Sequence, residues 1–284
     1  VNYADVATQI INQHSLTVGS RVARDNAFLP AAVLAAAGPD TTSIMFNRWD
    51  LDSGLNQRDA NKQTYQILLG AKGQLSAQWR YDISANYGQS KRHQTVQNNR
   101  LFDRYIAAID AIDVGNGQIV CRSDIDPASF NNLPGDFLTT RYSSSQGAIT
   151  FTPGVNSGCV PFNPLIIDNS TDNNVNQAAI DWIWQPTTNN SKNSQKIISA
   201  HLTGLIDEPL NFMTLSGGPI GVVLGGEYRE EKVANHFNGY ANQPVADHSG
   251  SDLSGRFDVT EVFTELSLPL LESLTVDGAY RYSD

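Results

Sequence analysis

Two cysteines, Cys121 and Cys159, are the residues with the most distinctive chemistry in this chain of 284 residues. Both lie in a stretch rich in Asn, Asp, Gly, Pro and Ser, and their spacing excludes a C-x-x-C redox motif or a zinc knuckle. Two interpretations stay open. They are unrelated thiols, or they form one disulfide that closes a loop of about 38 residues, stabilises it by roughly 3 to 4 kcal/mol and requires an oxidising compartment.

Catalytic and cofactor motifs are missing from the sequence. It contains neither a Walker or dinucleotide-binding loop nor a G-x-S-x-G nucleophile elbow, so we expect no enzyme activity, no cofactor and no metal site. The chain has 19 basic and 29 acidic residues, and 19 − 29 gives a net charge of −10. This charge argues against a nucleic-acid partner, which requires a basic face.

Aromatic and charged side chains form the other candidate sites. Trp182 and Trp184 lie in a long segment rich in Asn, Ser and Asp, where they could stack on a sugar or a siderophore. A set of charged residues recurs at alternate positions near the C-terminal end of the chain, and two interpretations apply to it: a hydrophilic track for a ligand or plug domain, or, as we favour, cross-strand ion pairs. This set is Glu227, Arg229, Glu231, Glu261, Glu265, Asp277 and Arg281.

The elements that position these residues are predicted by period-two alternation. Between Leu75 and Gly88 every odd position is apolar or aromatic and every even position is polar or Gly. Six segments show such a pattern, and they are longer than the ~5 to 6 residues of an ordinary soluble strand. We therefore predict an all-β fold with strands near residues 62–71, 75–91, 194–207, 219–233, 256–271 and 273–284.

The connections between these strands alternate between short and long. Residues 72–74 and 272–273 form tight turns and residues 208–219 a medium connection, whereas the outer loops span residues 90–192 and 234–256. Short turns on one side and long loops on the other are typical of a bacterial outer-membrane barrel, and a compact soluble domain rarely contains a loop of a hundred residues. No run approaches the ~20 apolar residues of a membrane helix. We predict part of a large antiparallel transmembrane β-barrel with short periplasmic turns and long extracellular loops. A soluble sandwich with one wetted face would show the same alternation.

Seven phrases of the sequence resemble a known family. They are similar to phrases of the TonB-dependent outer-membrane receptors, in particular the proteobacterial group with long loops. None of the phrases is specific alone, but the later ones are specific together, and the resemblance spans nearly the whole chain. The phrases are residues 25–31, residues 64–82 with Thr64-Tyr65, Leu69-Gly70, Gly73 and Trp79-Arg80-Tyr81-Asp82, Gln118-Ile119-Val120-Cys121-Arg122, Gly158-Cys159-Val160-Pro161-Phe162-Asn163, residues 218–231 with Gly226-Glu227-Tyr228-Arg229-Glu230-Glu231, residues 257–271 and residues 274–284.

The resemblance implies a function. It implies a disulfide between Cys121 and Cys159 and a place in the outer membrane of a Gram-negative bacterium, in contact with its lipid. It also implies uptake of a scarce nutrient, of the siderophore-iron or carbohydrate class, energised by the TonB–ExbB–ExbD complex. The signal peptide, plug domain and C-terminal strands of the family are not found, so residues 1–284 are expected to be an internal segment of the barrel domain. A passive porin-like channel and a soluble extracellular β-sheet binding module are the alternatives.

Overall fold

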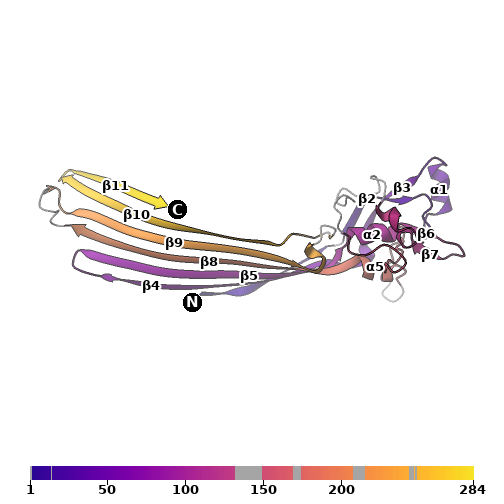
Figure 1. The fold of residues 1–284 in the computed structure, drawn as a ribbon, viewed down its shortest axis with the longest axis horizontal. Helices are drawn as coiled ribbons and strands as arrows, with labels where there is room; N and C mark the ends of the chain where they lie inside the picture. Colours follow the sequence, from indigo (N-terminus) through magenta and orange to yellow (C-terminus); the bar gives the residue numbers. More distant parts are fainter. Residues whose placement is uncertain are drawn as a thin grey trace.

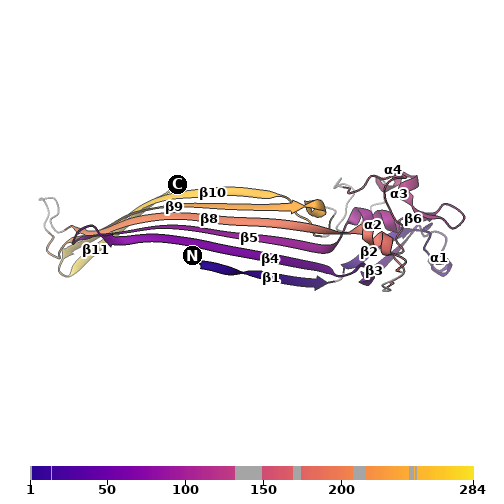
Figure 2. The same ribbon diagram turned by 90° about the horizontal axis from the view of Figure 1, so that it is seen from below.

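A long antiparallel sheet dominates the molecule (Figures 1 and 2). The computed structural model describes residues 2–13, 15–131, 149–168, 174–206, 215–242, 246 and 248–284. Every strand of the sheet pairs antiparallel with its neighbours. In spatial order the strands are β1 (Asn2–Gln13), β4 (Asn56–Gln74), β5 (Trp79–Arg100), β8 (Trp184–Ile206), β9 (Ile220–Asn238), β10 (Leu253–Leu271) and β11 (Leu274–Ser283).

A packed unit lies at the end of the sheet opposite the tight turns, and we call it the end unit (Figure 1). It contains two small two-stranded sheets, β2 with β3 and β6 with β7. Short helices surround these sheets, and the 3-10 turn η4 (Gly239–Asn242), which follows β9, contacts the end unit through Tyr240. In chain order, the strands and helices of the end unit are β2 (Ser15–Ala23), α1 (Ala31–Ala37), β3 (Ser43–Asp50), η1 (Leu51–Ser53), α2 (Phe102–Ile109), β6 (Ala111–Asp113), β7 (Ile119–Cys121), α3 (Arg122–Ile125), α4 (Pro127–Asn131) and α5 (Gln177–Ile183).

The prediction of an antiparallel, mostly β fold is confirmed, with a strand at each of the six predicted positions. The strands also pair along the chain as the short turns required: β4 with β5 and β10 with β11. Among the described residues the sheet is open, with β1 and β11 as its edges, and no closed barrel is formed. None of the helices in the described part of the chain is long and apolar enough to cross a membrane.

The predicted limits of the outer loops were wrong. β5 continues to Arg100 and pairs with β8 from Trp184 onward, so residues 90–192 are not one loop. Likewise β9 extends to Asn238 and β10 begins at Leu253, which shortens the predicted loop 234–256. The reason is that both faces of the sheet are polar in these stretches, so the alternation of apolar and polar residues stops although backbone pairing continues.

A compact core fills the end unit, in the middle of what the sequence predicted to be an open polar loop. All eight residues of α2 are buried, and Tyr105 of this helix packs against Phe162 and Trp184, with ring centroids 5.8 and 6.1 Å away. Asn26 donates a hydrogen bond to the carbonyl of Ile109 at the end of α2 (2.6 Å). The buried members of the core are Val22, Leu29, Tyr105, Ala108, Ile109, Phe162, Ala179, Ile180, Ile183 and Trp184.

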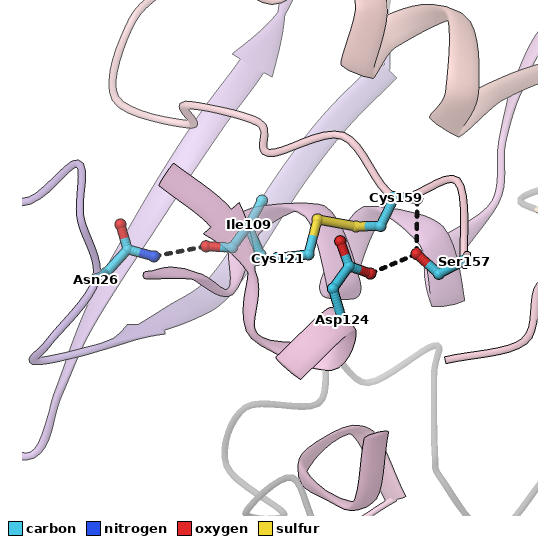
Figure 3. The surroundings of a disulfide bond; sticks show 6 residues. All are labelled: Asn26, Ile109, Cys121, Asp124, Ser157 and Cys159. Atoms are coloured by element: carbon cyan, nitrogen blue, oxygen red, sulfur yellow. Dashed lines mark hydrogen bonds between the residues drawn. A yellow bond between two sulfur atoms is a disulfide. The ribbon is translucent and has the colours of Figure 1, made fainter. Parts of the chain in front are cut away.

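The disulfide between Cys121 and Cys159 is confirmed, with the two Cα atoms 6.3 Å apart. Figure 3 shows that it joins the start of α3 to the segment before Phe162. Ser157 accepts a hydrogen bond from the amide of Cys159 (2.8 Å) and donates one to the Asp124 carboxylate. The disulfide therefore holds the segment that carries Phe162 against α2.

Candidate functional site

The register of the sheet sorts its side chains onto two faces with opposite chemistry. Tyr81 lies opposite Leu202, and the next pair, Asp82 and His201, points to the other side. The same relation holds from β4 to β11, so one face is apolar near the tight turns. The other face carries mostly polar side chains, with Leu68, Leu205 and Phe257 as exposed apolar exceptions, and we call it the polar face. We call the apolar region the belt. Its large exposed side chains include Ile67, Leu69, Ile83, Tyr87, Ile198, Leu224, Val262, Leu266, Val276, Tyr280 and Tyr282.

The belt has a defined height. On β5 it runs over nine residues, from Trp79 to Tyr87, which at about 3.3 Å per residue is roughly 26 Å along the strand. Beyond Tyr87, toward the end unit, the same face carries Lys91 and His93. Tyr87, the last belt residue on β5, lies opposite Lys196 on β8. On β8 the belt therefore ends at Ile198, which lies opposite Ala85 and is one pair nearer the tight turns. The border of the belt therefore runs obliquely to the strands. Such an oblique border is expected in a barrel, whose strands are tilted relative to the barrel axis.

Aromatic residues lie along both borders of the belt. At the border nearer the end unit, the Tyr65 and Tyr87 rings are 6.0 Å apart, and the Lys196 ammonium lies 5.8 Å from the Tyr228 ring. At the border near the turns, Trp79 lies over Gly204, where a Cβ atom would overlap the indole ring. The glycine on the neighbouring strand thus lets this ring lie flat on the sheet.

The seven charged residues predicted to share a face do so. Glu227 lies opposite Glu261, so these two residues are on the polar face. By the same register, the charged residues of β10 and β11 also lie on the polar face. The prediction that they interleave as ion pairs holds for one contact: within this set, in the described structure, Arg281 with Glu261 (3.7 Å) is the ion pair formed. Glu231 instead accepts a hydrogen bond from Gln195 (2.9 Å). Like charges therefore stand opposite each other, and the face stays open to polar contacts.

A hollow of about 760 Å³ lies on this polar face, level with the border of the belt that is nearer the end unit. Hydroxyl and amide side chains line it, among them Thr64, Ser90, Asn193 and Gln195. Phe257, which is 52% exposed, also lines it. Such a lining offers hydrogen-bond donors and acceptors beside an aromatic ring, and no catalytic arrangement.

The two tryptophans proposed as ligand contacts lie in the end unit, and the prediction needs correction for Trp184. Its side chain is 4% exposed and packs 5.7 Å from the Phe162 ring, so it belongs to the core and is closed to a ligand from solvent. Trp182 is half-buried: its ring contacts Phe151 edge-on (5.2 Å) and lies 5.2 Å from the Arg104 guanidinium. The reason for the error is that the segment before β8 is the helix α5, which turns its apolar side chains inward.

Arg104 holds several parts of the end unit together. Its guanidinium donates hydrogen bonds to the Trp182 carbonyl (2.9 Å) and to the Tyr240 hydroxyl (2.8 Å), and it lies 4.8 Å from the Tyr240 ring. Beside it, Asp103 accepts a hydrogen bond from the Thr150 hydroxyl (2.9 Å). Burial raises the pKa of the Asp103 carboxyl above its ordinary value, although the bonds from Thr150 act in the other direction. Tyr240 follows β9, so these contacts tie α2 to the sheet.

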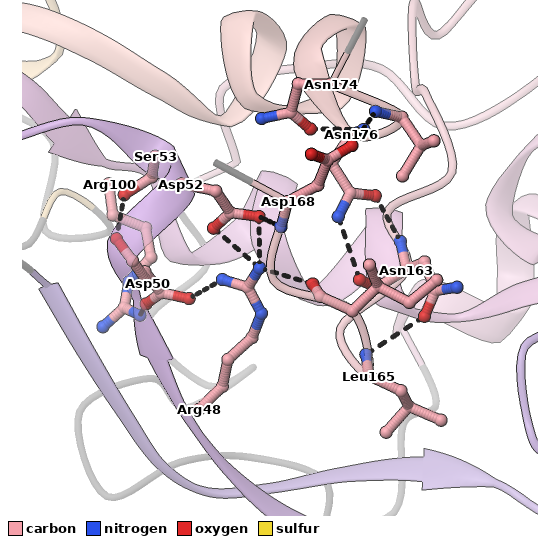
Figure 4. Close-up of polar contacts among 12 residues, drawn as sticks. Arg48, Asp50, Asp52, Ser53, Arg100, Asn163, Leu165, Asp168, Asn174 and Asn176 are labelled. Carbon is pink, nitrogen blue, oxygen red and sulfur yellow. Dashed lines mark hydrogen bonds and ion pairs between the residues drawn. The ribbon is translucent and has the colours of Figure 1, made fainter. Parts of the chain in front are cut away.

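A buried ion network joins the end of β5 to the end unit (Figure 4). Arg48 pairs with Asp50 and with Asp52, both at 2.6 Å, and Arg100 pairs with Asp50 at 3.0 Å. All four side chains are at most 4% exposed. Arg48 also donates to the carbonyl of Ile166 (2.9 Å). Two positive and two negative charges balance, which is what allows them to be buried.

A more exposed ion cluster lies at the start of α3. Arg122 pairs with Asp25 (2.6 Å) and with Asp110 (3.1 Å), and thereby links the segment after β2 to the end of α2. Burial raises the pKa of the Asp110 carboxyl, while the Arg122 guanidinium acts to lower it. The sequence alone gave no signal for either ion cluster, because each depends on a pair that joins distant positions, Arg100 with Asp50 and Arg122 with Asp25.

Metal ligation has no candidate in the described part of the chain, where no three His, Cys, Asp or Glu residues are placed to hold an ion. Comparison with protein-family models, with curated proteins and with solved structures finds no match to this chain.

Proposed function

We propose that this chain is a section of a transmembrane β-barrel receptor in the outer membrane of a Gram-negative bacterium. The belt lies against lipid, the polar face forms part of the inner wall, and the end unit stands on the outside of the cell. The belt is the single observation that carries this proposal.

The size and the height of the belt support a lipid contact. Soluble proteins rarely expose apolar patches larger than a few hundred Å², whereas here large side chains such as Leu69 (68% exposed) and Tyr280 (65%) recur on six neighbouring strands. Nine residues on β5 match the roughly 9 to 11 residues with which a tilted β-strand spans a bilayer. The aromatic borders match the interfacial girdles of such barrels.

The orientation follows from the two ends of the sheet. The tight turn between β10 and β11 lies at one end of the belt, as periplasmic turns do. The end unit lies beyond the other border, and its disulfide fits the oxidising cell exterior (Figure 1). The polar residues between belt and end unit would then stand above the membrane plane.

The receptor role itself rests on the resemblance to the TonB-dependent receptors. It assigns to the complete protein uptake of a siderophore-iron or carbohydrate nutrient, driven by the TonB–ExbB–ExbD complex. The hollow lined by Thr64, Ser90, Asn193 and Phe257 supports contact of the inner wall with a polar ligand or plug. A passive channel is the second candidate, since the unpaired charges on the polar face would also suit a water-filled pore.

Lysine substitutions on the two faces of β5 test the membrane contact. Ile83 lies in the middle of the belt and is 47% exposed, while the next residue, Ser84, points to the polar face. In the gene that encodes this chain, Ile83→Lys should destabilise the membrane-inserted barrel by about 2 to 4 kcal/mol, whereas Ser84→Lys should have a small effect. The measurement is the amount of protein in the outer-membrane fraction after urea washing, and its unfolding in detergent.

The outcomes separate the candidates. Equal behaviour of the two variants, or recovery of the unaltered protein in the soluble fraction, would contradict a lipid-facing belt. If the belt test succeeds, uptake in a strain without TonB separates the receptor from the passive channel, because only the receptor loses uptake. Induction of the gene by iron limitation or by plant-type carbohydrate then divides the two ligand classes.

A further inference from the structure

We propose that the outward face just above the belt binds a lipid that carries a phosphate in its headgroup, through Lys91 and Lys192. This inference rests on the proposed function, because it requires the belt to lie in a membrane. It goes further in naming the chemistry of the lipid and the residues that select it.

Lys91 and Lys192 lie directly opposite each other on the central strands β5 and β8, and both point to the face that carries the belt. Like charges at directly opposed positions of a sheet repel each other. Both side chains are exposed, and neither forms an ion pair with any described residue. An anion that bridges the two ammonium groups would remove this repulsion.

Other cations on the same face already have carboxylate partners. Lys232 pairs with Glu230 (2.8 Å), and Arg256 pairs with Glu230 (2.9 Å) and Asp258 (3.5 Å). His236, farther from the belt, bonds to Asp252 (2.5 Å). Lys196 on the same face lies opposite Glu230 and 5.8 Å from the Tyr228 ring. Among the described residues, Lys91 and Lys192 are thus the directly opposed cations on this face that form no ion pair. This is notable in a protein with a net charge of −10.

The surroundings of the two lysines can complete an anion site. A shallow cavity of about 420 Å³ lies over them, and Gln63, Asn61 and Asn190 contribute amide groups to its lining. His93 also lines it, with its ring 2.6 Å from the Asn190 amide oxygen. Ammonium and amide groups around one cavity are donors suited to phosphate oxygens.

The position relative to the belt selects a lipid over a free anion. Lys91 stands four residues above Tyr87, about 13 Å along a strand that is tilted to the membrane. At a strand tilt of about 45° this is roughly 9 Å in height, just beyond a headgroup layer of about 5 to 8 Å, and flexible lysine stems reach back into that layer. The acyl chains of a lipid held here would cover Ile83 and Ile67 below, which are exposed side chains of the belt. A free phosphate would gain nothing from the belt.

The test uses the complete protein in nanodiscs of phosphatidylcholine alone or mixed with phosphatidylglycerol. The double variant Lys91→Gln, Lys192→Gln should retain phosphatidylglycerol about 30-fold more weakly, as counted by native mass spectrometry of the released protein, since each lysine near an anionic surface contributes about fivefold. Retention of phosphatidylcholine should not change. The variant with Arg at both positions should retain the anionic lipid as the unaltered protein does.

The inner face supplies a matched control. Lys62 on β4 and Arg229 on β9 are cations of the polar face, and neither lines the cavity over Lys91 and Lys192. The variant Lys62→Gln, Arg229→Gln removes the same charge and should leave lipid retention unchanged. Equal loss in both double variants would show an effect of net charge and overturn the site, as would displacement of the lipid by inorganic phosphate at equal concentration. If the protein does not enter phosphatidylcholine nanodiscs at all, the proposed function fails; if it enters without a preference for phosphatidylglycerol, only this inference fails.

Discussion

The sheet and the end unit solve the folding problem in opposite ways. In the end unit, apolar side chains such as Tyr105 and Ile183 point inward and are at most 1% exposed. In the sheet, side chains as large as Leu69 and Tyr282 point outward, and the strands are joined mainly by backbone hydrogen bonds between neighbours. The end unit thus carries its own core, whereas the large apolar side chains of the belt stay exposed in the described structure.

This difference explains where the covalent and ionic links are found. The disulfide and the buried ion network both lie in or at the end unit, where short elements and long connections leave little regular hydrogen bonding. The sheet has strands of up to 23 residues and places its ion pairs on the surface. Changes to these links are therefore expected to affect the end unit and to leave the sheet intact.

The largest effect is expected from the buried ion network. Arg48→Met leaves the Asp52 carboxylate buried without a cation and leaves Asp50 with Arg100 as its remaining partner, and this should destabilise the end unit by about 3 to 5 kcal/mol. The measurement is hydrogen exchange in α2 and β3 of the folded protein. The sheet offers the control Arg256→Met, which breaks an ion pair whose arginine is 54% exposed and should change little. Equal protection of α2 in both variants would contradict the contrast between the two regions.

The disulfide comes next. Replacing Cys121 and Cys159 by Ala opens a loop of 38 residues and should destabilise the end unit by roughly 3 to 4 kcal/mol. Hydrogen exchange should increase around Phe162 and in α2, which the disulfide holds together, while β9 and β10 stay protected. Loss of protection in β9 and β10 as well would show that the sheet depends on the end unit for its folding.

The same contrast decides how much the sequence could predict. Ile83 and Ser84 show by alternation which way they point, because in a strand the face of a residue depends only on its position. Farther along β5, His93 and Gln94 are both polar, so the pattern gave no signal although the strand continues. The disulfide was predicted only through the family resemblance, since the spacing of the two cysteines alone left free thiols open.

The contacts between distant segments could not be predicted. Arg48 and Arg100 share Asp50 only because β3 packs beside the end of β5, and Lys91 meets Lys192 only through a register that pairs positions 101 residues apart (192 − 91). The sequence gave no signal for the strand β3, where the apolar Met45 and Trp49 are exposed and the charged Arg48 and Asp50 are buried. Trp184 was placed in a loop because the helix before it is short and its apolar residues face a core formed by α2.

The smallest effect is expected from pH, and it should again be confined to the end unit. Burial raises the pKa values of Asp103 and Asp110 in the folded protein, so the folded state binds more protons than the unfolded state between the ordinary pKa of aspartate, about 3.9, and the raised values. The contribution of these two groups to stability is therefore complete below pH of about 3.9 and is lost as the pH rises through the raised pKa values. Denaturation followed by the fluorescence of Trp182 and Trp184 should show this gain as the pH is lowered from neutral toward that range. In Asp103→Asn the gain should be smaller, because the amide carries no charge at any pH and keeps one acceptor for Thr150. An unchanged pH profile in this variant would contradict the prediction. It would mean that the Asp103 carboxyl is already protonated at neutral pH, or that Arg104 fully compensates its charge. In both cases this carboxyl would not make the stability of the end unit depend on pH.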